Sequence, residues 1–522
     1  MHWKTVFLAL VIVAAALWIY WPALNGDWLW DDEELITANS KLRSLQGLWR
    51  IWFAAPPDKW PLTSTLLWIE WQLWGNEPLG YHLCNLALHI LSGFLIWRLF
   101  NRLGLRWGWF GGFLFVIHPL AVESVAWASE IKNTLSLPLF LLSFDAWLDA
   151  EEKKSSYQRS VFFYCLAMLA KTSTIMLPLV LLLYCWWKRG RITRQELIQT
   201  IPYFFIAVML GLYSVYFQSP EQGVEVGGFS TRLIGAGSAI FFYLGKFIFP
   251  ATLMPIYPRW NLDTPSFLQV MALPTLVVLL FGFWTQRKGW GRHVLFGFGF
   301  FLLNLLPVVG LVRMTNDNVL PSVADHLCYI PPIGLIGLIV LGLEQLYGRL
   351  SLLPYLLSIG ALAAVLAMGL LLWESNSYAR LFSNQETFWT YNISHNPNAL
   401  FAYYNLGNVL MKTGRYPEAI KQFEQVLKIG PDHPDPHNNL GVLFLRTGRY
   451  PEAIKQFEQA LKIDSSNPVT HNNFGVALVE SGRPPEAIMQ FEQALRLKPE
   501  YADARKNLDE AHTRFILGPA KN

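Results

Sequence analysis

Four adjacent carboxylates, Asp31, Asp32, Glu33 and Glu34, directly follow the residues at positions 28–30, two of which are tryptophans. Burial and neighbouring charges shift the pKa of a carboxylate, and a carboxylate tuned in this way can take a proton from a hydroxyl group. This loop is therefore a candidate site for a general base held near a membrane surface. The alternative is a solvated acidic cap at the beginning of a helix, because Asp and Glu favour helix N-termini. The residues alone leave both interpretations open.

Further polar side chains stand near the ends of other apolar segments. Those that could bind a sugar or a phosphate are His118, Glu123, Lys132, Lys171 and His326. A lone His or Lys at such a position is most often an interfacial anchor, but several connections are expected on the same side of the membrane. Acidic groups suit an acceptor hydroxyl there, and cationic groups suit a lipid phosphate. The chain has no Gly-rich phosphate loop, which argues against a soluble nucleotide as direct donor. The histidines lack metal-ligand spacing, so we predict neither a metal nor another cofactor.

The segments that must position these residues are long and apolar. Of the 522 residues, 53% are hydrophobic and 15% are charged, whereas soluble proteins usually carry about 25% charged residues. Apolar runs of roughly 17–25 residues have the length of a helix that crosses the hydrocarbon core. We predict an all-α fold with eleven spans, near 4–22, 79–98, 107–122, 134–149, 160–171, 174–187, 201–217, 266–284, 294–311, 329–346 and 354–373. The basic residues are confined to particular loops, and nothing supports binding to nucleic acid.

Four basic clusters orient these spans. They are Arg98, Arg102 and Arg106; Lys153, Lys154 and Arg159; Lys188, Arg189, Arg191 and Arg194; and Arg287, Lys288 and Arg292. The positive-inside rule places them in the cytoplasm, with the N-terminus, and places everything after Trp373 on the opposite side. Counting 233–250 as a full span would reverse the orientation of the Arg287 loop, so we interpret that stretch as re-entrant or interfacial. Short loops and no visible retrieval signal favour a bacterial inner membrane with a periplasmic C-terminal region.

Two of the predicted spans have unusual features. The first apolar run resembles a signal peptide but lacks a small-residue cleavage site, so we interpret it as a retained span. The runs 160–171 and 174–187 are short and meet at Lys171. Irregular backbone at that depth is tolerated only against protein or a water-filled cavity. We therefore expect Lys171 to face the interior of the protein.

After residue 400 the chain repeats with a period of 34 residues. The period relates Gly407, Gly441 and Gly475, and likewise Gly414, Gly448 and Gly482, Ala419, Ala453 and Ala487, and Phe423, Phe457 and Phe491. Small residues recurring at this period are the signature of tetratricopeptide repeats. We predict a membrane domain over 1–375, a linker with a degenerate half-repeat over 376–401, and an α-solenoid over 402–516. The repeats are 402–434, 435–468 and 469–502, followed by a capping helix.

Asparagines recur once per repeat, at Asn405, Asn439 and Asn473. They stand on the first helix of each repeat, which normally lines the concave groove. A ladder of amides can hydrogen-bond the backbone of any extended peptide, because each amide both donates and accepts. The alternative is hydrogen bonding between helices within the stack, and both interpretations stay open.

The order of these motifs resembles that of the transmembrane and tetratricopeptide-repeat O-mannosyltransferases that modify cadherins, and their bacterial relatives, in the GT-C glycosyltransferase superfamily. The matching stretches are 26–32 with Ile36 and Asn39, 60–63, 80–85 with His89, 118–119 with Glu123, 170–172, and 324–326 with Tyr329. The resemblance covers essentially the whole chain. It implies a GT-C-like membrane domain followed by repeats that lie on the same side of the membrane as the acidic loop.

The resemblance also implies a reaction, namely transfer of a sugar, commonly mannose, from a polyprenyl-phosphate donor to a Ser or Thr hydroxyl of a protein. By position, Asp31 would be the catalytic base and Asp32 would position the acceptor or the sugar. His118, Glu123, Lys132, Lys171 and His326 would be candidates for binding the donor sugar and phosphate. Two departures leave the donor sugar open: Lys132 stands where an Arg is expected, and Asp325-His326 replaces a Glu-Arg pair.

Two other functions compete with this interpretation. The chain could be a non-catalytic membrane scaffold whose repeats serve a secretion or polysaccharide-assembly machine in the cell envelope. It could also be a glycosyltransferase that acts on a glycolipid. The acidic loop favours an enzyme over a scaffold, and the repeats favour a protein or peptide acceptor, because grooves of this kind bind extended peptides.

Overall fold

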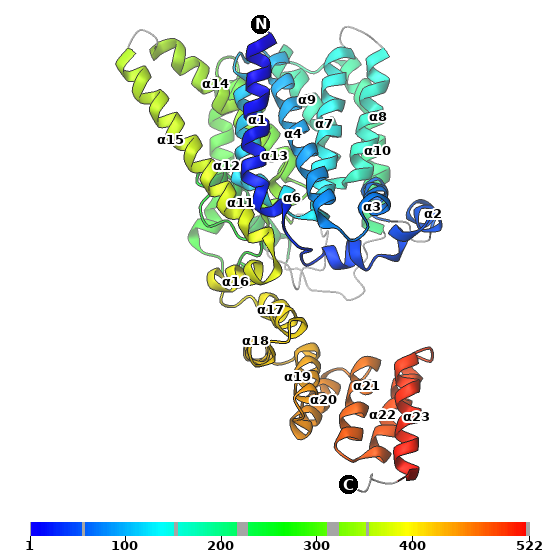
Figure 1. Ribbon diagram of the computed structural model, residues 1–522. Helices are drawn as coiled ribbons and strands as arrows, with labels where there is room; N and C mark the ends of the chain where they lie inside the picture. Colours follow the sequence, from blue (N-terminus) through cyan, green and yellow to red (C-terminus); the bar gives the residue numbers. More distant parts are fainter. Residues whose placement is uncertain are drawn as a thin grey trace. The chain divides into compact units, whose positions relative to one another are not determined.

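The computed structural model describes residues 2–54, 58–150, 155–216, 228–310, 323–350 and 354–517 (Figure 1). All regular secondary structure in these ranges is helical, as the sequence predicts. The chain divides into two compact units, Met1–Thr387 and Phe388–Asn522. Two residues of the predicted basic clusters, Lys153 and Lys154, lie outside the described ranges.

The first unit is a bundle of helices of unequal length (Figure 1). Its helices are α1 (His2–Leu24), α2 (Leu45–Phe53), α3 (Pro61–Trp74), α4 (Pro78–Arg102), α5 (Gly108–Ile117), α6 (Val122–Ala126), α7 (Ile131–Ala150), α8 (Ser155–Ala170), α9 (Leu177–Arg189), α10 (Arg194–Tyr216), α11 (Phe229–Ile248), α12 (Phe267–Thr285), α13 (Gly291–Leu305), α14 (Pro332–Leu350) and α15 (Pro354–Ala379). Helix α1 packs through Ile12, Ala16 and Ile19, which are fully buried.

Each of the eleven predicted spans falls on a helix, but not every helix has the properties of a span. Among the described residues, five helices are long and apolar enough to cross a membrane, or six if the bent pair α5 and α6 counts as one. They are α1, α4, α10, α12 and α15. Helices α8, α9 and α13 are shorter than 18 residues. The count of eleven therefore stays a prediction.

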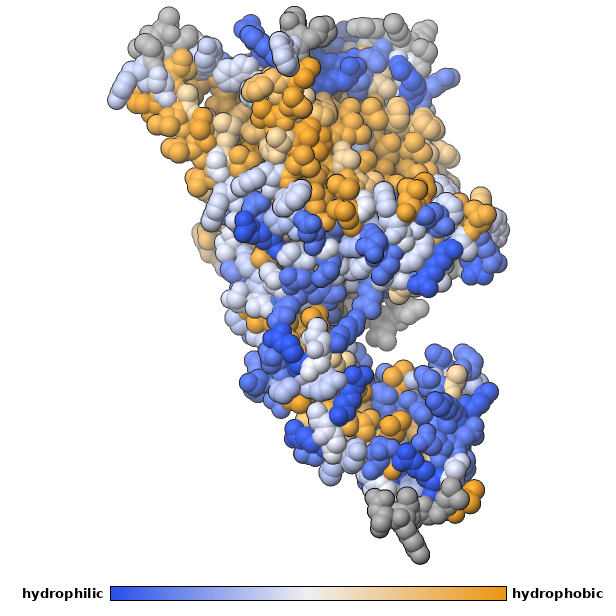
Figure 2. All heavy atoms as spheres, in the orientation of Figure 1, coloured by the Kyte–Doolittle hydropathy of each residue, from blue (hydrophilic) through white to orange (hydrophobic). Residues whose placement is uncertain are grey.

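Apolar side chains form a band across the first unit, with hydrophilic residues on either side of it (Figure 2). Helices α12 and α15 expose large apolar side chains, among them Val278, Phe281, Leu362 and Leu370, which are 60–69% exposed. Water would solvate such a surface poorly, whereas lipid would cover it. This band is the expected property of a unit embedded in a membrane.

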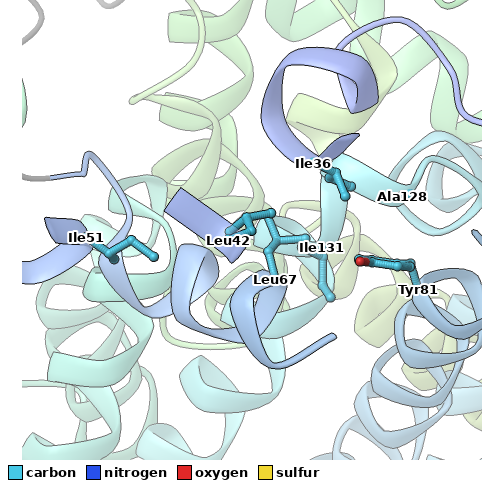
Figure 3. Packing of buried hydrophobic residues seen from close by; sticks show 7 residues of the cluster. All are labelled: Ile36, Leu42, Ile51, Leu67, Tyr81, Ala128 and Ile131. Atoms are coloured by element: carbon cyan, nitrogen blue, oxygen red, sulfur yellow. The ribbon is translucent and has the colours of Figure 1, made fainter. Parts of the chain in front are cut away.

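A compact apolar cluster supports the acidic loop from below (Figure 3). Its buried members are Ile36, Leu42, Ile51, Leu67, Tyr81, Ala128 and Ile131. They come from the turns after the acidic loop, from α2, α3 and α4, from the 3₁₀ turn Ala128–Glu130 and from the beginning of α7. The cluster thus fixes residues 31–37 against the segment around residue 130.

The segment predicted to be re-entrant or interfacial forms α11, an uninterrupted helix of 20 residues. It buries one face through Ala236, Ile240 and Tyr243. A re-entrant loop needs a break at which the chain turns back, and α11 has none, so that alternative was wrong. The interfacial position stays a prediction.

The irregular segment predicted at Lys171 is confirmed, and a second one, at His118, interrupts the predicted span 107–122 and was not predicted. Helices α5 and α6 meet at an angle of 59° across His118. Helix α8 ends before Lys171, whose backbone is extended, and a 3₁₀ turn over Thr172–Met176 leads into α9. At these breaks the side chains of His118 and Lys171 are buried in the first unit.

The second unit is a stack of antiparallel helix pairs. Its helices are α16 (Gln385–His395), which begins just before the boundary, α17 (Leu400–Lys412), α18 (Tyr416–Ile429), α19 (Pro434–Arg446), α20 (Tyr450–Ile463), α21 (Pro468–Glu480), α22 (Pro484–Leu497) and α23 (Ala502–Leu517). The 34-residue period has a steric cause: a Cβ at Gly407, Gly441 or Gly475 would lie 2.5–2.7 Å from the nearest atom of a Phe ring on the paired helix.

Candidate active site

The acidic loop has a strained and irregular backbone. Trp30 adopts a positive φ of 31°, which is uncommon for a residue with a side chain. Its ring stacks on Trp127 at a centroid distance of 5.4 Å. The next turn, Glu33–Thr37, is a short π-helix, a form that often occurs at functional sites. Such strain persists only where the surrounding structure determines it, here the Trp30–Trp127 stack and the apolar cluster below.

Asp32 is fully buried and fastens the loop to the rest of the unit. Its Oδ2 accepts from the backbone N–H of Leu29 at 2.9 Å, and its Oδ1 accepts from the N–H of Ser129 at 2.8 Å. Burial raises the pKa of Asp32 to about 7, although both backbone bonds oppose this shift. With both oxygens engaged, Asp32 is suited to positioning the loop rather than to reacting.

Asp31 differs from Asp32 in its exposure and in its partners. It is only partly buried, and among the described residues its carboxylate has no hydrogen-bond partner. Burial raises its pKa, and the charge of Lys132 opposes this shift most strongly. A partly accessible carboxylate with a raised pKa, beside a cation, has the properties of a general base.

A network of buried side chains lies next to Asp31. Lys132 Nζ is 2.6 Å from Glu130 Oε1, and Asn133 Nδ2 donates to Glu130 Oε2, also at 2.6 Å. Lys171 Nζ donates to Asn133 Oδ1. Burial alone would raise the pKa of Glu130, but Lys132, His326 and Lys171 together lower it to about 2. Glu130 therefore stays ionised and holds the lysines in place.

His326 joins the same network through Glu123 and Asn133. Its Nδ1 is 2.8 Å from Glu123 Oε1, and its backbone N–H donates to Glu123 Oε2 at 3.0 Å. The carbonyl of His326 accepts from Asn133 at 3.1 Å. Burial would lower the pKa of His326, but Glu130 and Glu123 raise it above its ordinary value, so this imidazole favours its cationic form. The structure thus brings Glu123, Lys132, Lys171 and His326 together.

Asp325, next to His326, is a further buried carboxylate. Its two oxygens accept from the hydroxyls of Tyr257 and Tyr378, each at 3.0 Å. Burial, followed by the charge of Glu123, raises its pKa to about 8. Asp325 anchors the segment that presents His326.

One residue that the sequence did not indicate, Lys59, completes the cationic side of the site, beside Trp60 of the 60–63 stretch. The Nζ of Lys59 lies 4.4 Å from the ring centroid of Trp60, and the Nζ of Lys132 lies 5.4 Å from the same centroid. Burial, then the charge of Lys132, lowers the pKa of Lys59 to about 8. The Trp60 Nε1–H is buried without a hydrogen-bond partner among the described residues. Only the position of Lys59 beside the 60–63 motif could have pointed to it.

His118 does not join this network. Its Nδ1 accepts from the backbone N–H of Leu120 at 3.3 Å, and its Nε2 lies 3.1 Å from the carbonyl of Phe247. The imidazole also stacks on the Phe247 ring at 4.9 Å. Both ring nitrogens therefore bond to backbone groups, one at the bend between α5 and α6 and the other on α11. The role of His118 in binding the donor stays a prediction.

The asparagine ladder is bonded within the stack of repeats. Asn439 Nδ2 donates to Asn408 Oδ1 at 2.9 Å, and Asn473 Nδ2 donates to Asn438 Oδ1 at 3.2 Å. Asn405 donates to the carbonyl of Phe401 on its own helix. These are the bonds between and within helices that the alternative interpretation expected. The three side chains remain partly exposed, so binding of a peptide stays a prediction.

In the part of the chain that the structure describes, the network offers Asp31 as a carboxylate without a hydrogen-bond partner, influenced by the charges of Lys132 and His326. Among the described residues, no group of three or more His, Cys, Asp or Glu side chains is arranged to hold a metal ion. The expectation that the reaction needs no metal or cofactor stays a prediction. The arrangement can remove a proton at Asp31 and stabilise negative charge on an oxyanion beside the lysines and His326.

Known proteins are similar to the repeats of the second unit, and others are similar to most of the chain. Residues 398–466 and 472–513 match the tetratricopeptide repeat family. The chain is 21% identical over 468 residues to a protein O-mannosyl-transferase of Caenorhabditis elegans, which covers 81% of this chain and 63% of that one. It is 24% identical over 527 residues to protein O-mannosyl-transferase Tmtc3 of Drosophila melanogaster, covering 81% and 55%. The chain thus spans less than two thirds of the length of these relatives.

Two solved structures of repeat proteins are similar to about a quarter of the chain. The tetratricopeptide domain of Arabidopsis OM64 is 23% identical, with a TM-score of 0.22, and covers 22% of this chain and 95% of that domain. The repeat protein YrrB is 25% identical, with a TM-score of 0.24, and covers 25% and 68%. Scores this low carry no argument about function.

Proposed function

We propose that this chain, a relative of the protein O-mannosyl-transferases over 81% of its length, is a membrane glycosyltransferase. In this proposal it moves a sugar, mannose by analogy with the relatives' names, from a polyprenyl phosphate to Ser or Thr hydroxyls of a protein. The observation that carries the proposal is the Asp31 carboxylate, which has a raised pKa and stands beside the charge of Lys132. A scaffold would have no use for such a group.

The reaction follows from the positions of these groups. Asp31 accepts the proton of the acceptor hydroxyl while the hydroxyl oxygen bonds to the anomeric carbon of the sugar. The bond between that carbon and the phosphate oxygen breaks, and its electron pair leaves with the lipid phosphate. Lys132, Lys171 and His326 supply the positive charge that stabilises this leaving group, with Glu123 and Glu130 holding them. Asp32 positions the loop that carries Asp31.

The placement of the chain in the membrane is part of the same proposal. Eleven spans with the N-terminus in the cytoplasm would put the acidic loop and the repeats on the same, non-cytoplasmic side. We infer a GT-C-type enzyme of a bacterial inner membrane, with the repeats recruiting the acceptor in the periplasm. Tetratricopeptide repeats commonly bind extended peptides, and the match of this array to that family supports a protein acceptor.

One observation supports a second candidate. The ladder amides of Asn439 and Asn473 already bond within the stack, which weakens the argument that the repeats hold a peptide. A glycosyltransferase that acts on a glycolipid would need no such groove. It would use the same Asp31 and the same cations, and it would differ only in its acceptor.

A transfer assay tests the proposal. The full chain in lipid would receive radiolabelled polyprenyl-phosphate sugars together with proteins and lipids from its own envelope, with the Asp31→Asn variant in parallel. We expect label on protein with the native chain alone. Label on lipid would favour the glycolipid acceptor. If no donor were transferred or hydrolysed and proteins copurified through the repeats, the scaffold would replace the enzyme.

A further inference from the structure

A cavity of about 220 Å³ lies in the first unit, far from the acidic loop. It is bordered by the end of α4, by α9, and by long stretches of α13 and α14. Tyr81, at the beginning of α4, belongs to the cluster below the acidic loop, and Leu99 on the same helix lines the cavity. At 1.5 Å per residue these two positions are about 27 Å apart along the helix. The cavity is therefore not part of the candidate active site.

The cavity is an apolar slot whose length follows the helix axes. Its lining extends along α13 from His293 to Phe300 and along α14 from Ile333 to Leu341. These stretches correspond to about 10–12 Å of helix rise. Leu103, Leu338 and Leu341 remain partly exposed, so the slot reaches the surface of the unit. A slot of this form fits an alkyl chain lying parallel to the helices.

The two ends of the slot differ in polarity. Trp187 and His293 lie close to helix ends, and the Trp187 Nε1–H donates to His293 Nδ1 at 3.1 Å. The second ring nitrogen of His293, Nε2, has no hydrogen-bond partner within the described ranges, so it can bind a ligand. Near Phe300 and Ile333 the slot is lined by apolar side chains and glycines. A lipid in one leaflet has the same polarity, with a polar head at the helix ends and a tail towards the middle.

Positive charge surrounds the polar end. Arg292 precedes His293, and its Nε is buried without a hydrogen-bond partner among the described residues. Arg106 follows the α4 end and is exposed. Both belong to the basic clusters that the sequence places on the cytoplasmic side, where anionic lipids attract Lys and Arg.

We propose that this slot binds one acyl chain of an anionic phospholipid from the leaflet on that side, with the phosphate beside Arg292 and His293. The donor lipid is a poorer fit, because the cations proposed to hold its phosphate lie at the other end of the unit. Binding here would fasten α4, α9, α13 and α14 to one another. The inference does not depend on the proposed transfer reaction.

The chain offers a matched pair of variants on α14. A Cβ at Gly337 would lie 3.4 Å from the Phe100 ring, an ordinary contact at the slot wall, so Gly337→Leu would fill the slot. A Cβ at Gly342 would meet nothing within 4 Å, so Gly342→Leu adds the same side chain outside the slot. Leu105→Phe narrows the slot from another element, should Gly337→Leu fold poorly.

Native mass spectrometry of the delipidated full chain would measure binding of phosphatidylglycerol and of phosphatidylcholine. We expect the native chain and Gly342→Leu to retain one phosphatidylglycerol, and the slot-filling variants to bind it at least about tenfold more weakly. Arg292→Gln should reduce the preference for phosphatidylglycerol over phosphatidylcholine. Equal binding by all variants, no binding to the native chain, or displacement of the phospholipid by polyprenyl phosphate would overturn the proposal.

Discussion

Charged residues are used in opposite ways at the acidic-loop site and in the repeat array. In the site, a few charges are buried in irregular backbone and bond across long sequence separations, as His326 does to Glu123. In the array, the Arg that precedes each second helix forms an exposed pair with a Glu three residues later, in the first turn of that helix: Arg415 with Glu418, Arg449 with Glu452, and Arg483 with Glu486. Buried charges are costly unless paired, so they persist where they have a task, whereas exposed pairs contribute little.

The strongest test of this contrast is within the acidic loop itself. Asp31→Asn should reduce the transfer rate by about 10²- to 10⁴-fold, because it removes the proposed general base. Folding should be unaffected, since the Asp31 carboxylate has no hydrogen-bond partner among the described residues. Initial rates of transfer and the yield of folded protein would measure both effects. Glu34→Gln is the matched control, because Glu34 is an exposed carboxylate three residues away. Equal losses in both variants would refute the assignment.

The pH dependence of stability should depend on Asp32. Burial raises its pKa from 3.8 to about 7 in the folded chain, so the folded state prefers the protonated form. Its contribution to stability is therefore complete below about pH 4 and is lost as the pH rises through about 7. Asp32→Asn cannot ionise but loses one acceptor oxygen. The variant should be less stable than the native chain, and this difference in unfolding midpoint should shrink from about pH 4 to about pH 7.5. A difference that is constant or grows with pH would show that the ionised form is the preferred one.

Replacing Lys59 tests whether the cationic side of the site includes a residue that the sequence did not indicate. The ammonium groups of Lys59 and Lys132 both lie over the Trp60 ring. Because both groups carry a positive charge and are partly or fully buried, they repel each other. An anionic donor would relieve this repulsion. Lys59→Met should raise the KM for the lipid-linked sugar about tenfold, equivalent to about 1.4 kcal/mol, with a smaller change in kcat. Lys288→Met, an exposed lysine elsewhere in the first unit, is the control. A change in kcat alone would place Lys59 outside the donor site.

The array was easier to predict than the site because its constraints are local and repeated. The period of Gly407 and Phe423 reports one steric contact that recurs in each repeat, and the left-handed Gly414, Gly448 and Gly482 mark each turn. The irregular segment at Lys171 could also be predicted, since a charged residue interrupts apolar runs there, whereas the bend at His118 falls within the predicted span 107–122. The hydrogen-bond partners of the site residues could not be predicted. Nothing local in the sequence indicates that Asn133 links Glu130 to Lys171, or that both nitrogens of His118 bond to backbone.

The smallest effect is expected within the array, and it decides what the asparagine ladder does. Asn439→Ala removes a bond to Asn408 in the preceding repeat and should lower the stability of the array by about 1 kcal/mol. Glu452→Gln breaks an exposed pair on the neighbouring helix and should leave stability unchanged. Thermal unfolding of the full chain, followed by a probe in the array, would measure both. If Asn439→Ala left stability unchanged but weakened binding of an acceptor peptide, the ladder would serve the peptide rather than the stack. The array would then resemble the site, with its polar groups held for a ligand.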